Sequence, residues 1–106
     1  MIVVTSGHIE GKKIKQTLGI STGNTVRSRN IGKDIMAAFR NIVGGEVMEY
    51  AQLLSSSRSQ AIERMIEHAE NMGANAVVDV RITTSAVMAG TSEILAYGTA
   101  VILEDE

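Results

Sequence analysis

Apolar and polar residues alternate with a period of two near the end of the chain, which is the spacing of a half-buried strand. Over residues 76–83 this pattern predicts one shared apolar face made of Ala76, Val78, Val80 and Ile82. After a turn at residues 89–92, residues 93–103 are apolar on both faces. Such a strand is either central in its sheet or covered by a neighbouring subunit.

The amino-terminal part of the chain predicts further strands. Residues 2–5 are apolar and β-branched, and residues 12–18 carry a weaker alternation. Gly23-Asn24 is acceptable hairpin chemistry, so residues 21–24 predict a turn that leads into a strand at Thr25-Val26-Arg27. Together these segments predict an antiparallel amino-terminal unit.

Between the two strand regions the apolar spacing changes to three and four, which is typical of amphipathic helices. A first helix is predicted to begin at Asn30 and to end at Gly44-Gly45, with its apolar stripe on Ile31, Ile35, Phe39 and Ile42. A second, longer helix is predicted from about Val47 to Met72, ending at Gly73. The serines within residues 55–59 are weak helix formers, so a bend there is an open alternative to one straight helix.

The order of these elements predicts the fold class. Strands come first, two helices follow and a strand pair ends the chain, which favours an α+β fold with a mostly antiparallel sheet and helices on one face. The chain has 106 residues, of which 44% are hydrophobic and 3% aromatic, so residues 1–106 form one domain with a small aliphatic core. Folding of a chain this short buries roughly 60 to 68% of its extended surface. We therefore expect association between copies to add stability.

Composition also bears on location and chemistry. The chain has no cysteine, which removes disulfides, thiolate metal sites and cysteine nucleophiles, and favours a reducing compartment. No signal peptide is indicated at the amino terminus. The longest uncharged apolar stretch, residues 94–103, has ten residues where a membrane span needs about 20. The sequence therefore predicts a soluble, cytoplasmic protein that does not bind membranes.

Charge is distributed unevenly. Residues 11–40 carry seven basic groups and one acidic group, whereas residues 41–106 carry three basic and ten acidic groups. This asymmetry has two interpretations: an anion-binding patch near the amino end, or opposite patches that meet between subunits. We favour the second. The basic cluster of Arg27, Arg29 and Lys33 is typical of solvated surface, with a contact to a neighbour's acidic patch as the second interpretation and ligand binding as the third. Nucleic-acid binding is not expected, because the chain is neither basic overall nor rich in aromatic residues.

Several segments carry a resemblance to a known family. They are residues 9–12 (IEGK), 23–27 (GNTVR), 40–46 (RNIVGGE), 73–78 (GANAVV) and 96–101 (AYGTAV). In this order they resemble the YbjQ-like family of small bacterial and archaeal proteins. The resemblance implies a compact α+β fold, assembly into a homopentameric ring and a heavy-metal-binding label without an established activity. Two positions depart from the family pattern: Asp79 stands where Gly is common and Thr83 where Asp is common.

Residues that could ligate metal are sparse. Two histidines, His8 and His68, lie far apart in the sequence, and a zinc or copper site usually needs three or four ligands. The i, i+4 pair of His68 and Met72 is better explained by a surface histidine beside a core methionine. Symmetry copies of Glu10 or Asp79 around a ring stay open as a carboxylate site, with His8 as a further weak candidate.

The remaining candidates concern ligands and subunit contacts. The glycines of Gly44-Gly45-Glu46 favour a helix stop, with anion binding by the next helix and Arg40 as the alternative. Tyr50 is a candidate for a pocket wall or a subunit contact. The candidate ligand or interface residues are therefore Arg27, Arg29, Arg40, Glu46 and Tyr50. No phosphate-binding glycine motif occurs, and no catalytic residue or cofactor is indicated.

The leading hypothesis is a non-catalytic homo-oligomeric binding or scaffold protein with pockets between subunits. A metal- or small-anion-binding protein with sites between the subunits of a homopentameric ring is the alternative. An enzyme with an intersubunit site is the second alternative. The doubly apolar last strand and the charge asymmetry favour the first.

Overall fold

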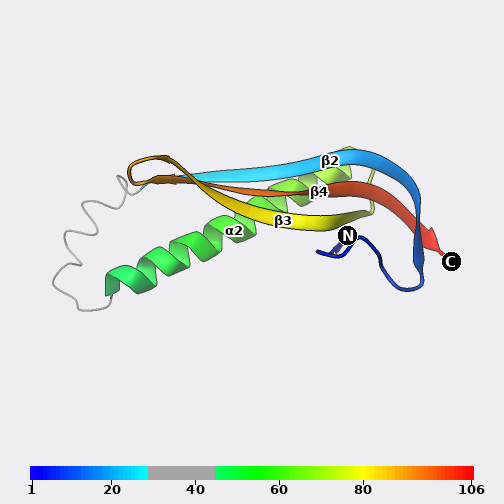
Figure 1. Cartoon of the computed structure of the whole chain (residues 1–106), viewed down its shortest axis with the longest axis horizontal. Coiled ribbons are helices and arrows are strands. Elements are labelled where there is room, and N and C mark those ends of the chain that lie inside the picture. The colour runs from blue at the N-terminus through cyan, green and yellow to red at the C-terminus, as the bar shows by residue number, and fades with distance from the viewer. Residues whose placement is uncertain (29–44) are drawn as a thin grey trace.

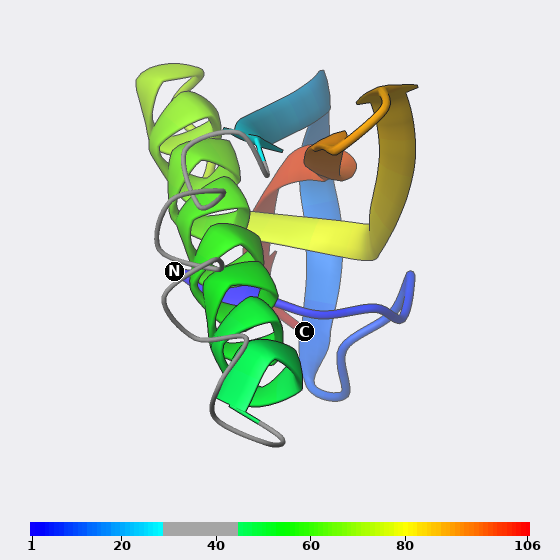
Figure 2. The same cartoon turned by 90° about the vertical axis from the view of Figure 1, so that its left-hand side faces the viewer.

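The computed structural model describes residues 1–28 and 45–106, with side chains described for residues 1–27 and 51–106. The described elements are β1 (Ile2–Val3), β2 (Lys12–Ser28), α2 (Gly45–Asn71), β3 (Ala76–Met88) and β4 (Thr91–Asp105). The four strands form one sheet in the order β1-β3-β4-β2 (Figure 1). Helix α2 lies on one face of this sheet (Figure 2).

The α+β class and a helix on one face are confirmed, but the sheet is mixed rather than antiparallel. Strand β1 pairs in parallel with β3, with Ile2 opposite Ala76, whereas β4 is antiparallel to both β2 and β3. The predicted antiparallel amino-terminal unit is therefore wrong, because the first strand adds to β3 and not to β2. Among the described residues there is one helix, and the predicted helix that begins at Asn30 lies outside them.

Strand β2 runs without a turn through residues where a hairpin was predicted. It has 17 residues, and Gly23 pairs with Ala96 of β4 in the middle of the ladder. The reason is the packing of α2: a Cβ at Gly23 would lie 2.2 Å from the carbonyl oxygen of Ala61. Glycine is present because helix and strand backbones approach closely here, and not because the chain reverses.

Strand β3 changes its facing at Asp79, so the predicted shared face of its apolar residues is wrong. Asp79 has φ 54°, and the β3–β4 register shifts between Val78 and Arg81. This bulge places two residues opposite Gly98 and inverts the alternation. As a result Val77 and Val80 face α2, whereas Ala76 and Val78 belong to the cluster on the opposite face.

Helix α2 is confirmed as one continuous helix of 27 residues that includes the serines. Its contact stripe recurs every four residues and is fully buried: Ser57, Ala61, Met65 and Ala69. Two hydroxyl groups of β2 donate to carbonyl oxygens of this stripe: Ser21 Oγ to Met65 at 2.6 Å and Thr25 Oγ1 to Ser57 at 3.2 Å. A serine is accommodated in the helix because it lies in this small-residue contact.

The core is small and the molecule is elongated. One cluster lies between α2 and the sheet, and a second on the opposite face is covered by Val4 and Ile9. The radius of gyration is 17.5 Å, whereas a compact domain of this length would have about 13 Å. Of the two alternatives for the last strand, the central position is the one observed, since β4 lies between β3 and β2.

Candidate functional site

Of the predicted ligand or interface residues, the structure describes the side chain of Arg27. Its Nη2 donates to Gln60 Oε1 of α2 at 2.6 Å, so this half-buried guanidinium joins β2 to the helix. Arg29 and Arg40 lie outside the described residues. Glu46 and Tyr50 fall within α2, where their side chains are not described. The structure therefore brings Arg27 to Gln60 and does not test the rest of this set.

Three polar residues of α2 form a column along the outer edge of β2. We call Gln60, Arg64 and His68 the α2 column; they are spaced by four residues and so share one helix face. Besides the Arg27 contact, Arg64 Nη1 donates to the carbonyl oxygen of Asn24 at 2.6 Å. The backbone N–H of Thr22 donates to His68 Nδ1 at 3.0 Å. Backbone groups of β2 are thus held by helix side chains.

Sequence analysis did not identify the α2 column, although its spacing is visible. Each member directly precedes a residue of the buried stripe, namely Ala61, Met65 and Ala69. A polar row at i, i+4 and i+8 beside an apolar row predicts a helix margin that contacts whatever flanks the core. What the pattern lacks is the identity of that neighbour, which depends on β2 being one long strand.

The contact of His68 decides its metal chemistry. A neutral imidazole has one N–H and one accepting nitrogen. Because Nδ1 accepts the Thr22 N–H, the lone pair of this nitrogen is already engaged and is not free to bind a metal. Met72 is half-buried against the core cluster. The interpretation of this pair as surface histidine and core methionine fits both contacts.

The start of β2 carries lysines that are paired with the end of β4. Lys12 Nζ donates to Asp105 Oδ1, and Lys13 Nζ lies 3.4 Å from Glu104 Oε1. The hydrogen bond from Lys12, and then its positive charge, lower the pKa of Asp105 below its ordinary value. The β2–β4 register also shifts twice in this stretch, between Ile14 and Gln16 and between Thr17 and Gly19. Lysines and bulges of this kind discourage strand addition at an edge.

The far part of β3 carries no charge, although its register with β4 also shifts once, between Ala86 and Met88. Residues 2–6 follow its outer edge as far as Val80, whose N–H donates to the carbonyl oxygen of Val4. Beyond that point, residues 82–88 pair with β4 on one side, but their outer edge has no strand partner among the residues that the structure describes. This segment has no charged residue, glycine or proline, and Val87 and Met88 are 58% and 62% exposed. An uncharged, partly apolar free edge favours pairing with another strand.

The candidate metal ligands were tested against the geometry. Across residues 1–27 and 51–106, no group of three or more His, Asp or Glu side chains could hold a metal ion. His8, Glu10 and Asp79 are all exposed. Asp79 lies beside Gly7, where an added Cβ would be 3.0 Å from its Oδ2. Within one chain, the described residues therefore do not fit a resident heavy-metal site.

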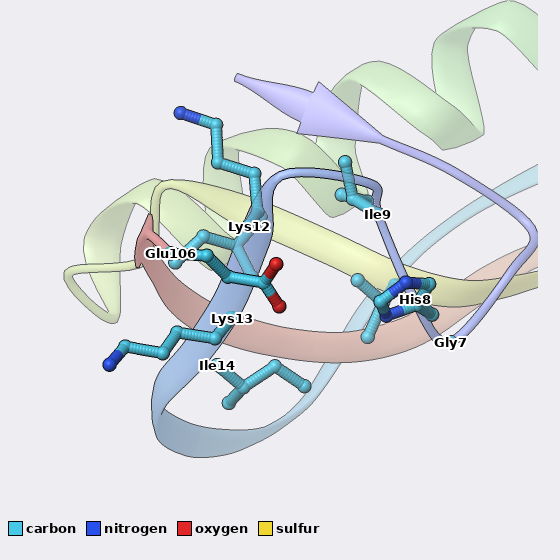
Figure 3. Close-up of a pocket in the computed structure, with 9 residues that line it drawn as sticks. Gly7, His8, Ile9, Lys12, Lys13, Ile14 and Glu106 are labelled. Carbon is cyan, nitrogen blue, oxygen red and sulfur yellow. The ribbon is translucent and has the colours of Figure 1, made fainter.

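A shallow cavity of about 230 Å³ lies under the loop between β1 and β2. Its lining combines apolar and polar residues: Ile9, Ile14, Val78 and Leu103, and His8, Lys12, Lys13 and Glu106. The Glu106 carboxylate and the His8 ring lie on opposite sides, whereas both lysine ammonium groups point away (Figure 3). The cavity is smaller than the roughly 300 to 1,000 Å³ of ordinary ligand pockets.

Comparisons with known proteins extend over the whole chain. A family model described as "Putative heavy-metal-binding" matches residues 1–104. A UPF0145 protein of Methanosarcina acetivorans is 55% identical over 101 residues, covering 95% of each chain. One of Clostridioides difficile is 51% identical over 106 residues, covering all of this chain and 95% of its own.

A solved structure supports the architecture. The crystal structure of a protein with unknown function from Pediococcus pentosaceus is similar with a TM-score of 0.66 and 12% identity, covering 98% of each chain. At this identity the likeness concerns the fold alone. In the described part of this chain, no helix is long and apolar enough to cross a membrane.

Proposed function

Because the chain belongs to the YbjQ family and its UPF0145 relatives are about half identical to it, we propose that it is a ring-forming homo-oligomer. The ring acts as a non-catalytic binding or scaffold protein, with its ligand sites between subunits. The subunit number, five, is what the family resemblance implies. The candidate site residues at these boundaries are Arg27, Arg29, Arg40, Glu46 and Tyr50.

The observation that carries this proposal is the uncharged outer edge of β3 at residues 82–88, which no strand of the described residues covers. Strands β2 and β3 run in the same direction, since both are antiparallel to β4. Ser28 and Met88 both pair with Thr91, so the ends of β2 and β3 lie at the same end of the sheet (Figure 1). A neighbour's β3 end placed beside the end of β2 would continue the sheet.

This contact is heterologous, because it joins two different edges. A heterologous contact generates a closed ring when its rotation closes. The elongated shape and the exposed apolar residues near the sheet end support the same arrangement, since a ring would cover Val26, Val87 and Met88. Association would then supply the burial that the small core lacks.

A proline substitution tests this edge directly. Backbone groups of a strand alternate between its two sides. Thr22 directs its N–H away from β4, to His68, so the backbone groups of its partner Tyr97 point toward β3. Arg81 is the β3 partner of Tyr97 and therefore points toward β4. Three residues later in the same regular register, the N–H of Thr84 points the opposite way, to the outer edge of β3. Thr84→Pro removes that donor, whereas Thr84→Val retains it. We expect monomers for the proline variant and rings for the valine variant by native mass spectrometry.

A second variant guards against misfolding of the first. Val87→Lys places a charge on an exposed edge position without altering the backbone. Folding of each variant is checked by far-ultraviolet circular dichroism. If folded Thr84→Pro and Val87→Lys proteins both keep the wild-type mass, this edge is not the interface.

Metal or small-anion binding between the subunits is the second candidate, supported by the description of the family model. The described residues of one chain hold no three-ligand cluster, and in this proposal the site is completed by carboxylates from several copies. Metal analysis of untagged protein discriminates the two functions. One metal per ring or per chain, retained through purification, would favour this candidate over the scaffold.

A further inference from the structure

The α2 column contacts the groups that an added strand would need. Thr22 and Asn24 are alternate residues, so their backbone groups point to the same side of β2. The Thr22 N–H goes to His68 and the Asn24 carbonyl oxygen to Arg64, so that side is the outer edge. An N–H and a carbonyl two residues apart on an outer edge are the pairing groups for another strand.

The flanking stretches of β2 differ in how they are protected. Before residue 20, two register shifts and the lysines Lys12, Lys13 and Lys15 interrupt the edge. At Thr22 and Asn24 the edge is regular and uncharged, with each side chain exposed. This regular stretch is the one that the helix side chains cap.

We propose that the α2 column is a strand stop, which closes the middle of the β2 edge against addition of a second copy of this chain. A strand arriving at Thr22 would have to displace the imidazole, and at Asn24 a charged guanidinium that donates to the carbonyl. The last step rests on the ring of the proposed function. In that ring, the strand stop limits pairing of the neighbour's β3 to residues 25–28 of β2. It thereby sets the register of the interface.

Amide hydrogen exchange tests the contact itself. In His68→Ala the Thr22 N–H loses its acceptor, and we expect its exchange to become at least tenfold faster. Glu67→Ala changes the adjacent exposed residue of the helix and should leave Thr22 unchanged. His68→Gln offers an amide oxygen as acceptor and should restore protection in part. Equal Thr22 exchange in the wild type and in His68→Ala would overturn the proposal.

Assembly size tests the consequence. The double variant His68→Ala/Arg64→Ala leaves both pairing groups of the edge open, and we expect species larger than the wild type by native mass spectrometry. Glu63→Ala/Glu67→Ala is the matched control, because both residues are exposed on the same helix. An unchanged mass distribution in the folded double variant would overturn the strand stop.

These results separate the strand stop from the ring. If the wild type is a monomer, the ring fails, while the strand stop still requires the double variant to associate. If the wild type is a ring and the double variant has the same mass, the strand stop fails and the ring stands.

Discussion

Gly23 of β2 lies directly against the backbone of α2 at Ala61. A Cβ built on Gly23 would be 2.2 Å from the Ala61 carbonyl oxygen and 2.2 Å from the Met65 nitrogen. Both obstacles are backbone atoms of a helix, which cannot rotate away as a side chain can. This contact fixes how closely α2 approaches the sheet, and therefore brings the α2 column to the edge of β2.

We expect Gly23→Ala to destabilise the protein by roughly 1–3 kcal/mol or more, because the helix must move away from the strand. Urea unfolding measures the change. Gly11→Ala is the control: Gly11 has φ 76° but nothing within 4 Å of an added Cβ, so its cost is one of backbone conformation alone. A loss at Gly23 no larger than that at Gly11 would contradict the close packing.

At Asp79 the backbone adopts a left-handed conformation, with φ 54°. Glycine adopts it without a Cβ clash, and Asp tolerates it better than Ala. We therefore expect Asp79→Gly to be more stable than Asp79→Ala by about 1 kcal/mol in chemical denaturation. Equal stabilities would show that the bulge does not impose this conformation.

The Lys12–Asp105 pair predicts a pH effect. The pKa of Asp105 is lower in the folded protein than its ordinary value. The pair therefore stabilises the fold at pH values above the ordinary carboxyl pKa, and this stabilisation is lost as the pH falls through the pKa of Asp105 in the folded state. In Lys12→Met we expect the pKa of Asp105 to rise toward its ordinary value in a carboxyl NMR titration. Lys15→Met removes the same charge from β2 and should not reproduce that rise. An equal rise in both variants would point to net charge in place of the pair.

Two buried serines at the helix–strand contact should respond differently to removal of the hydroxyl. Ser57 Oγ is buried without a hydrogen-bond partner, whereas Ser21 Oγ donates to the Met65 carbonyl oxygen. We expect Ser57→Ala to stabilise by about 0.5 kcal/mol, because Ala is also the better helix former. Ser21→Ala should cost about 1 kcal/mol. Thermal unfolding of the two variants would contradict this account if the order were reversed.

Long-range apolar patterns in the sequence predicted the main elements correctly. The four-residue spacing of Ala61, Met65 and Ala69 is that of the buried stripe of α2. The doubly apolar run over residues 93–103 became β4, whose two faces are covered at its buried end by α2 and by the loop carrying Val4 and Ile9. These patterns are reliable because each depends on many residues facing one core.

The wrong predictions concern places where a single residue determines the course of the backbone. Gly23-Asn24 has the composition of a turn, but a close helix also requires glycine, and the local sequence does not distinguish the two. At Asp79 one bulge inverts which face of the sheet the following side chains point to. The alternation of apolar residues over 76–83 does not reveal such a bulge. The α2 column was missed for a related reason, because its partners belong to the half of β2 that was predicted as a turn and a new strand.

Native mass spectrometry of the untagged wild-type protein, taken directly from cells, tests the central claim most directly. The account predicts a single closed assembly with the mass of five chains, with any retained ligand visible as added mass. A stable monomer at micromolar concentration would contradict it, because the outer edge of β3 would then not pair with a neighbouring chain.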